Sequence, residues 1–134
     1  MHTSLRWWMF LVVASTCLVG QALAQPRFTF DATPGQLGKD VVPSEYRLAL
    51  DLDPAKDTFA GVVDIALKVR RPVEAIVLNA FGLTAGAVAL TGSGGTRPMT
   101  ATDDKTTRQW RIADGRPIEL GEYTLRIAYT GIVN

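Results

Sequence analysis

The chain has 134 residues, which is enough for one domain of ordinary size. It carries 14 Lys and Arg against 13 Asp and Glu, with a single His and a single Cys. A charge balance this close to zero gives no electrostatic reason to bind nucleic acid or an anionic membrane. The scarcity of His and Cys argues against a zinc site and against a nucleophile activated by imidazole, because both depend on those side chains.

The first 24 residues have the organisation of a secretory signal peptide. Arg6 supplies a basic start, residues 7–19 are almost continuously apolar, and Ala22 and Ala24 form a small-x-small cleavage site. The apolar run is shorter than the ~20 residues that cross a bilayer. We therefore expect a cleavable signal helix over residues 1–24, cleavage after Ala24, and a periplasmic or secreted product that does not contact the membrane. An uncleaved N-terminal anchor is the alternative.

Cleavage would change the chemistry that the chain can perform. His2, Arg6 and Cys17 all lie before Ala24, so the mature chain would have no His, no Cys and equal numbers of acidic and basic residues. No imidazole would then remain to activate a serine or to bind zinc. We accordingly expect no catalytic, cofactor-binding or metal-ligating residue in this chain, and a fold that forms without disulfides.

Residues 25–38 have the composition of a loose N-terminal arm. They combine prolines and glycines with the isolated aromatics Phe28 and Phe30. Such a mixture is typical of segments that wrap over a neighbouring surface or stay mobile. The folded domain is therefore expected to occupy residues 39–134.

Two segments with strict period-two alternation predict a long hairpin. In residues 44–53, Tyr46 and three following Leu residues fall on one face, and mostly charged residues fall on the other. Residues 59–70 repeat the pattern, so the apolar faces of both strands are expected to be buried together. The intervening residues 53–57 contain Asp and Pro, which is typical of a turn.

Four further strands are predicted after this hairpin, at residues 75–80, 87–90, 106–112 and 121–129. The first of them is apolar on both faces, which favours a central place in the sheet. Residues 91–98 are rich in Gly and are expected to form a loop. Six short strands without helical periodicity indicate an all-β fold, either an antiparallel saddle-like sheet or a β-sandwich. The last strand has no cap, so its free edge is expected to invite pairing.

Two groups of residues could suggest ligand sites, and each has a simpler explanation. Asp51, Asp53 and Asp57 could bind calcium, but their spacing does not match a calcium-binding loop, and Asp is favoured in turns for backbone reasons. The glycine-rich residues 92–95 could cradle a phosphate, but the Lys-Ser/Thr and the helix start of a phosphate loop are missing. We therefore expect turns at both places, and at residues 103–104 for the same reason.

Five aromatic residues could form a platform on which sugars stack, namely Tyr46, Phe59, Trp110, Tyr123 and Tyr129. Each of them, however, falls on the apolar face of its predicted strand. Aromatic residues at this spacing are expected to lie in the core.

Four segments carry a common signature: residues 42–53, 59–69, 76–83 and 121–131. The first opens with Pro43, continues with Tyr46 three residues later, and then alternates Leu. The others alternate apolar residues, and the last runs into a Gly-containing turn. In this order, and over residues 39–134, they resemble the N-terminal β-domain of the aminopeptidase N family of gluzincin zinc metallopeptidases.

The resemblance implies a saddle-like β-domain that packs against a thermolysin-like catalytic domain. That domain would hold zinc through a His-Glu-x-x-His motif and grip the substrate amine through a Gly-x-Met-Glu-Asn segment, and neither motif occurs in this sequence. The family's β-domain also lends a side chain to the amine site just beyond the Gly turn, where Asn134 ends this sequence. We therefore expect an incomplete domain, cut off before the catalytic half, with zinc in the parent enzyme and no cofactor in this chain.

These features lead to one expected function and one alternative. The expected function is a non-catalytic N-terminal module of an exported zinc aminopeptidase, which supports the structure and shapes the substrate entrance. Its partner would be the catalytic domain of the parent enzyme, or a second copy through an exposed strand edge, with neither nucleic acid nor membrane involved. The alternative is a stand-alone envelope or secreted β-sandwich that binds a glycan or a protein.

Overall fold

The computed structural model describes residues 28–35 and 37–133. The predicted signal peptide and its cleavage site lie outside the described residues. The described part of the chain is free of helices, so it offers no helix that could cross a membrane. Its seven strands are β1 (Val41–Leu52), β2 (Thr58–Val69), β3 (Ile76–Asn79), β4 (Leu83–Gly92), β5 (Gly95–Asp104), β6 (Gln109–Ala113) and β7 (Gly121–Ile132).

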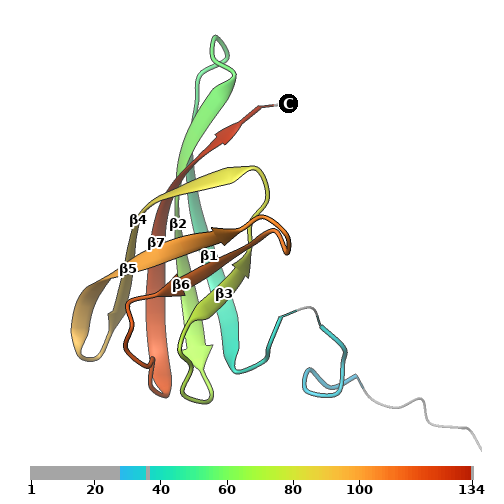
Figure 1. Cartoon of the computed structure of the whole chain (residues 1–134), viewed down its shortest axis with the longest axis vertical. Coiled ribbons are helices and arrows are strands. Elements are labelled where there is room, and N and C mark those ends of the chain that lie inside the picture. The colour runs from blue at the N-terminus through green and yellow to red at the C-terminus, as the bar shows by residue number, and fades with distance from the viewer. Residues whose placement is uncertain (1–27, 36, 134) are drawn as a thin grey trace, which may run out of the picture.

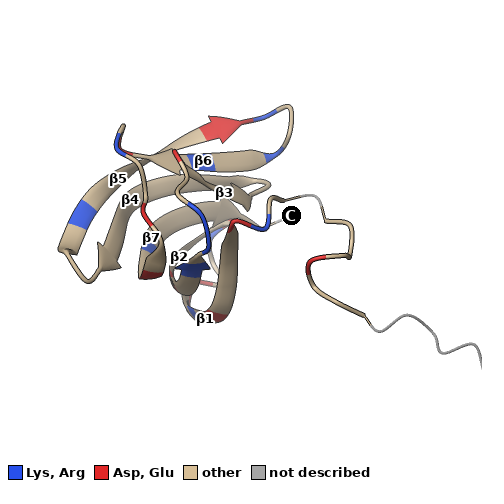
Figure 2. Cartoon of the chain, turned by 90° about the horizontal axis from the view of Figure 1, so that it is seen from below, with Lys and Arg blue, Asp and Glu red and all other residues tan. Residues whose placement is uncertain are grey.

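The strands form one antiparallel sheet in the order β1-β2-β7-β4-β5-β6-β3. The sheet curls on itself into a half-barrel (Figure 1). Seen from below, β5 and β6 lie on one side of this curl, and β1 and β2 lie on the other (Figure 2). The all-β prediction is therefore confirmed, and of the two predicted architectures the single curved antiparallel sheet is the one observed.

The hydrophobic core fills the inside of the curl. Alternate residues of β2 and β7 share it in register, with Ile65 directly opposite Leu125. The largest side chains that are fully buried are Val69, Ile76, Leu90, Ile112, Ile118, Leu125 and Ile127. Burying a side chain of this size stabilises a fold by about 1.5–3 kcal/mol relative to leaving it exposed. The two ends of the sheet, β1–β2 and β6–β3, are thus held across the curl by apolar packing.

Two glycines within strands make room for aromatic rings. Gly61 on β2 lies opposite Tyr129 on β7, and a Cβ atom at Gly61 would lie 2.6 Å from the Cζ atom of Tyr129. Gly131 lies opposite Phe59, and a Cβ atom there would collide with the ring of Phe59. The two rings meet edge to face, with their centroids 6.3 Å apart. These glycines therefore serve packing between strands.

The third strand lies at the edge of the sheet, so the predicted central place of residues 75–80 is wrong. β3 pairs with β6 alone among the described strands. It is apolar on both faces because Ile76 is buried in the core, while Val77 lines a small pocket with Leu37 and Val41. The apolar residues on both faces of β3 therefore reflect its position where the curled sheet closes. They do not indicate a strand that lies between two other strands.

The last strand lies inside the sheet, so the predicted free edge of the C-terminal strand is wrong. β7 pairs with β2 along its whole length and with β4 on its other side. Among the strands that the structure describes, β1 and β3 are the two with a single neighbour. The prediction failed because the order of strands along the chain does not determine their order in the sheet.

Most of residues 91–98, predicted as a loop, belong to strands. β4 begins earlier than predicted, at Leu83, and runs to Gly92, while β5 starts at Gly95 after a two-residue turn. Pro98 and several threonines hide the alternation of β5. Proline is tolerated there because β5 pairs only with β4 at this position and meets β6 further along, so the missing N–H interrupts no second ladder.

Candidate interaction surface

A row of apolar side chains on β1 is exposed, although the sequence predicted that it is buried. Tyr46, Leu48, Leu50 and Leu52 are 59%, 58%, 49% and 62% exposed. All four point to the core-facing side of the sheet, because each lies opposite an inward-facing residue of β2. Toward its turn, the β1–β2 hairpin projects beyond the strands that close the curl (Figure 1), which leaves that part of the row uncovered. At the other end of the row, Tyr46 borders a small pocket that β3 also lines. We refer to these four side chains as the β1 apolar row.

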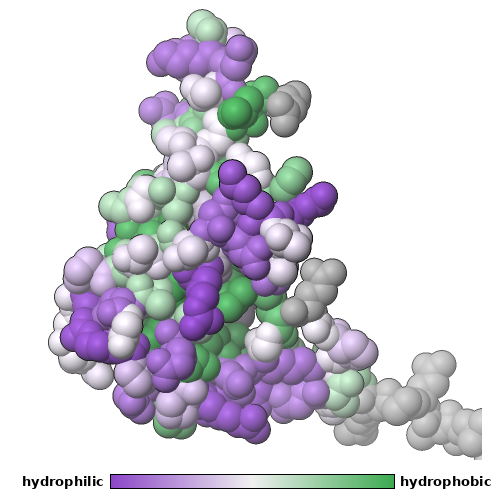
Figure 3. Space-filling view, viewed as in Figure 1, coloured by the Kyte–Doolittle hydropathy of each residue, from purple (hydrophilic) through white to green (hydrophobic). Residues whose placement is uncertain are grey.

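Further apolar side chains lie at the projecting end of the sheet. Phe59 on β2 is half-buried against the core, whereas Ile132 at the end of β7, on the other face, and Val133 just after it are 65% and 55% exposed. Figure 3 shows hydrophobic surface at this end of the molecule, next to hydrophilic side chains. An exposed apolar patch of this kind indicates a site of contact with another protein or another domain. The β1 apolar row and this end form the candidate interaction surface.

The opposite face of the sheet carries an open apolar groove of about 500 Å³. It is lined mainly by small residues of neighbouring strands, including Ala49, Ala60, Gly86 and Ala128. Asp51 is the one charged side chain among the described residues that line it. A catalytic site needs an acid, a base or a nucleophile that converge on one point. This lining provides no such convergence.

The predicted turn residues make the hydrogen bonds that turns require. The Oδ1 atom of Asp53 accepts a hydrogen bond from the N–H of Ala55 at 3.0 Å, and its Oδ2 atom pairs with Lys56 Nζ at 3.0 Å. The hydrogen bond from Ala55 holds the pKa of Asp53 below its usual range. Asp104 Oδ1 likewise accepts a hydrogen bond from the N–H of Thr106 at 2.9 Å. The turn prediction is therefore confirmed for residues 53–57, whereas it is wrong for residues 103–104, which end β5 and precede a turn at residues 105–108.

The other residues considered for ligand binding do not assemble into a site. Among residues 28–35 and 37–133, no three His, Cys, Asp or Glu side chains lie close enough to hold a metal ion. The glycine-rich residues 92–95 form a tight hairpin turn in which Gly92 pairs with Gly95. This turn leads into strand β5, whereas a phosphate loop leads into a helix.

The aromatic residues divide into four that join the core and one that does not. Trp110 and Tyr129 are buried, and Phe59 and Tyr123 pack partly buried against the same cluster. The core prediction is confirmed for these four. It is wrong for Tyr46, which is exposed at the beginning of the β1 apolar row.

A partly buried carboxylate joins β5 to the segment that follows β6. Asp114 pairs with Arg97 at 3.1 Å and with Arg116 at 2.6 Å, and its side chain is 10% exposed. Burial works against ionisation of Asp114, but hydrogen bonds from Arg116 and the charge of Arg97 outweigh it, so the pKa of Asp114 lies below its usual range. These contacts indicate that the cluster serves as a structural link between β5 and the segment after β6.

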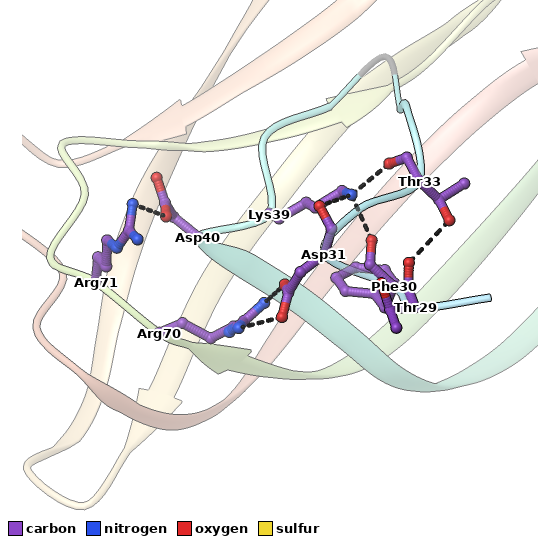
Figure 4. A network of polar contacts seen from close by, with 8 residues as sticks. All are labelled: Thr29, Phe30, Asp31, Thr33, Lys39, Asp40, Arg70 and Arg71. Atoms are coloured by element: carbon purple, nitrogen blue, oxygen red, sulfur yellow. Dashed lines mark hydrogen bonds and ion pairs between the residues drawn. The ribbon is translucent and has the colours of Figure 1, made fainter. Parts of the chain in front are cut away.

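The described part of the N-terminal arm is fastened to the end of β2 (Figure 4). Both Nη atoms of Arg70 donate to the carboxylate of Asp31, at 2.6 and 3.2 Å. The hydrogen bond from Arg70 holds the pKa of Asp31 below its usual range. Lys39 Nζ donates to the carbonyl oxygens of Phe30, Asp31 and Thr33, so the arm folds around it. We refer to these contacts as the arm clasp.

Comparison with known proteins shows which family this chain resembles. Residues 42–134 match the family model of the Peptidase M1 N-terminal domain. The chain is 33% identical over 127 residues to Aminopeptidase N from Acetobacter pasteurianus, in an alignment that covers 90% of this chain and 35% of that protein. The chain thus spans about a third of the length of this relative.

Solved structures show the same fold. The M1 zinc metallopeptidase from Deinococcus radiodurans has a TM-score of 0.57 at 22% identity, over 71% of this chain and 21% of that one. A mutant form of that protein bound to a Tyr-Ser-Ala substrate gives the same TM-score over 70% of this chain. At this identity the likeness concerns the fold alone. The family match over most of the chain confirms the resemblance predicted from sequence, and the chain belongs to the family of M1 peptidase N-terminal domains.

Proposed function

We propose that this chain is the non-catalytic N-terminal module of an exported zinc aminopeptidase. The observation that carries the proposal is the β1 apolar row, which lies on the core-facing side of the sheet but beyond the strands that close the curl. Covering such a row is favourable by roughly 25 cal/mol for each Å² of apolar surface removed from water. The curated relative continues for about two thirds of its length outside the matched part, which leaves enough chain to supply the cover.

In this proposal the chain supplies a wall, and the covering domain supplies the chemistry. The described residues do not fit a zinc ion, because no three potential ligands among them lie close together. The zinc ion and the groups that act on the peptide bond therefore belong to the covering domain. The curled sheet holds its own core, so it can keep one side of the substrate entrance in a fixed position.

The proposed location outside the cytoplasm depends on the signal peptide. Arg6, the apolar run after it and the Ala22-x-Ala24 site support export followed by cleavage. Sequencing the N-terminus of the protein recovered from the periplasm or medium tests this directly. We expect it to start at Gln25, and a product that retains Met1 would contradict cleavage.

The docking role is tested by calorimetric titration of the chain into the catalytic part of the Acetobacter pasteurianus relative. We expect binding that Leu50→Asp weakens at least tenfold, because the new carboxylate would lose its hydration in an apolar contact. The control is Thr102→Asp, which places the same charge at an exposed position on β5. Equal affinity of the two variants would contradict docking through β1. Zinc-dependent release of amino acids from an aminoacyl-anilide by this chain alone would overturn the non-catalytic role.

A stand-alone module that binds a glycan or a protein is the second candidate. The observation in its favour is Tyr46, an exposed aromatic ring next to a small pocket that Leu37 and Pro43 also line. A sugar could stack on such a ring. Retention on a glycan array that Tyr46→Ala abolishes would favour this candidate over the first.

A further inference from the structure

β1 is the long free edge of the sheet. It pairs with β2 on one side and with none of the described strands on the other, whereas β3 at the opposite edge has only four residues. Residues 44–53 contain neither proline nor glycine, and Pro43 and Pro54 bound them. An edge strand of this length presents backbone N–H and C=O groups that can pair with another strand.

The charges on β1 favour a second copy of β1 as the partner. On the outer face, Arg47 and Asp51 stand on either side of Ala49. Arg47 binds Glu45 of its own strand through Nε at 2.7 Å and Nη2 at 3.4 Å, which leaves Nη1 for a further carboxylate. Asp51 is exposed and forms no ion pair with the part of the chain that the structure describes.

We propose that two copies of this chain pair antiparallel through their β1 edges, about a two-fold axis that passes at Ala49. This register places Arg47 of each copy directly opposite Asp51 of the other, so the attraction occurs twice. Cβ atoms of directly opposite residues lie ~4.5–5.5 Å apart, which is within reach of an ion pair. The small side chain of Ala49 lets the two strands meet on the axis.

The same register joins the β1 apolar rows of both copies. Leu48 of one copy lies opposite Leu50 of the other, and Tyr46 lies opposite Leu52. The axis is perpendicular to the sheet, so both rows remain on the core-facing side. The pairing uses the backbone edge, whereas the proposed docking of a catalytic domain uses the face, so the two proposals can fail independently.

The neighbouring registers are less favourable. An axis between two residues brings an inward-facing side chain opposite an outward-facing one, which no continuous sheet allows. Moving the axis by one residue toward the N-terminus places Glu45 opposite Asp51, two like charges. Moving it by one residue toward the C-terminus places Arg47 opposite Asp53, whose carboxylate is already bound within its own turn. The axis at Ala49 also places Glu45 opposite Asp53, but within each copy Arg47 and Lys56 already pair with these two carboxylates. It is the register that brings the unpaired Asp51 opposite an arginine, so we select it.

Sedimentation velocity of the purified chain over a range of concentrations tests the pairing. We expect a monomer–dimer equilibrium, which Asp51→Arg weakens roughly tenfold because each pair becomes repulsive. Arg47→Asp is expected to weaken it similarly, and the double variant Arg47→Asp with Asp51→Arg is expected to restore it. The control Asp103→Arg makes the same change of charge at an exposed position on β5 and should leave the equilibrium unchanged.

A melting curve of each variant separates loss of pairing from loss of folding. Arg47 lies opposite Asp64 within the sheet, so Arg47→Asp can reduce the stability of the monomer itself. Ala49→Lys then serves as the second variant, because it places two like charges on the axis at an exposed position and should abolish the dimer. A chain that stays monomeric, or a dimer that Asp51→Arg and Ala49→Lys leave intact, would overturn the proposal.

Discussion

β1 and β7 carry the same alternation of apolar and polar residues, yet one row is buried and the other is exposed. On β7, Leu125 and Ile127 are 0% and 1% exposed, whereas on β1, Leu48 and Leu50 are 58% and 49% exposed. Both strands flank β2, and both rows point to the core-facing side. The difference therefore comes from cover, since the closing strands lie over β7 but not over the projecting part of β1 (Figure 1). The alternation in sequence shows which face of a strand is apolar. The part of the protein that buries this face can come from outside the domain.

The largest expected effect is the loss of a core side chain from β7. Ile127→Ala removes a fully buried group and should lower the free energy of unfolding by about 2–5 kcal/mol. The matched change on β1, Leu50→Ala, should lower it by less than about 1 kcal/mol, because that side chain is already half exposed. Urea denaturation followed by tryptophan fluorescence measures both. Equal losses would show that the β1 apolar row is packed as tightly as the row on β7.

A smaller effect is expected where β2 passes β7 at a glycine. Gly61→Ala pushes a methyl group against the ring of Tyr129 and should lower the free energy of unfolding by about 1–3 kcal/mol. The control is Gly94→Ala, at a position where a Cβ atom meets open space. Combining Gly61→Ala with Tyr129→Leu tests the cause, because the smaller side chain should recover part of the loss. A loss at Gly94 as large as that at Gly61 would contradict the steric explanation.

Local features of the fold were predictable, because short-range patterns determine them. The hairpin of β1 and β2 was expected at residues 44–53 and 59–70, and its turn was recognised from Asp53 and its neighbours. Features that depend on distant parts of the chain were not predictable. The insertion of β7 between β2 and β4 and the match of Gly61 with Tyr129 both join residues far apart in sequence.

For the same reason, the apolar row of the candidate surface was predictable from the sequence, but its exposure was not. Alternation identified Tyr46 and the three Leu residues as one apolar row. Whether that row is covered depends on how far the curl of the sheet brings β3 and β6 across, and no short stretch of sequence encodes that distance. The order of strands along the chain suggests a free edge at the last strand, but in the sheet β7 lies between β2 and β4.

A third effect concerns the polar link at Asp114, whose folded pKa lies below the ordinary Asp value of ~3.9. A lowered folded pKa means that the carboxylate contributes stability above its unfolded pKa and loses this contribution as pH falls through the folded pKa. Asp114→Asn should therefore lower stability at neutral pH and flatten its decrease toward acid. Urea midpoints at a series of pH values measure this. The control is Asp103→Asn, at an exposed position on β5, which should change the neutral midpoint less.

The smallest effect on global stability is expected at the arm clasp, where contact depends on exposed charges rather than on burial. The side chains of Arg70 and Asp31 are 40% and 67% exposed, so Arg70→Gln should leave the urea midpoint nearly unchanged. The local effect should be larger, with faster chymotrypsin cleavage after Phe30, and added salt should act on the natural chain in the same direction. Arg71→Gln is the control, since Arg71 pairs with Asp40 at 3.5 Å and does not bind the arm's Asp31. Equal cleavage of both variants would mean that the Lys39 contacts hold the arm by themselves.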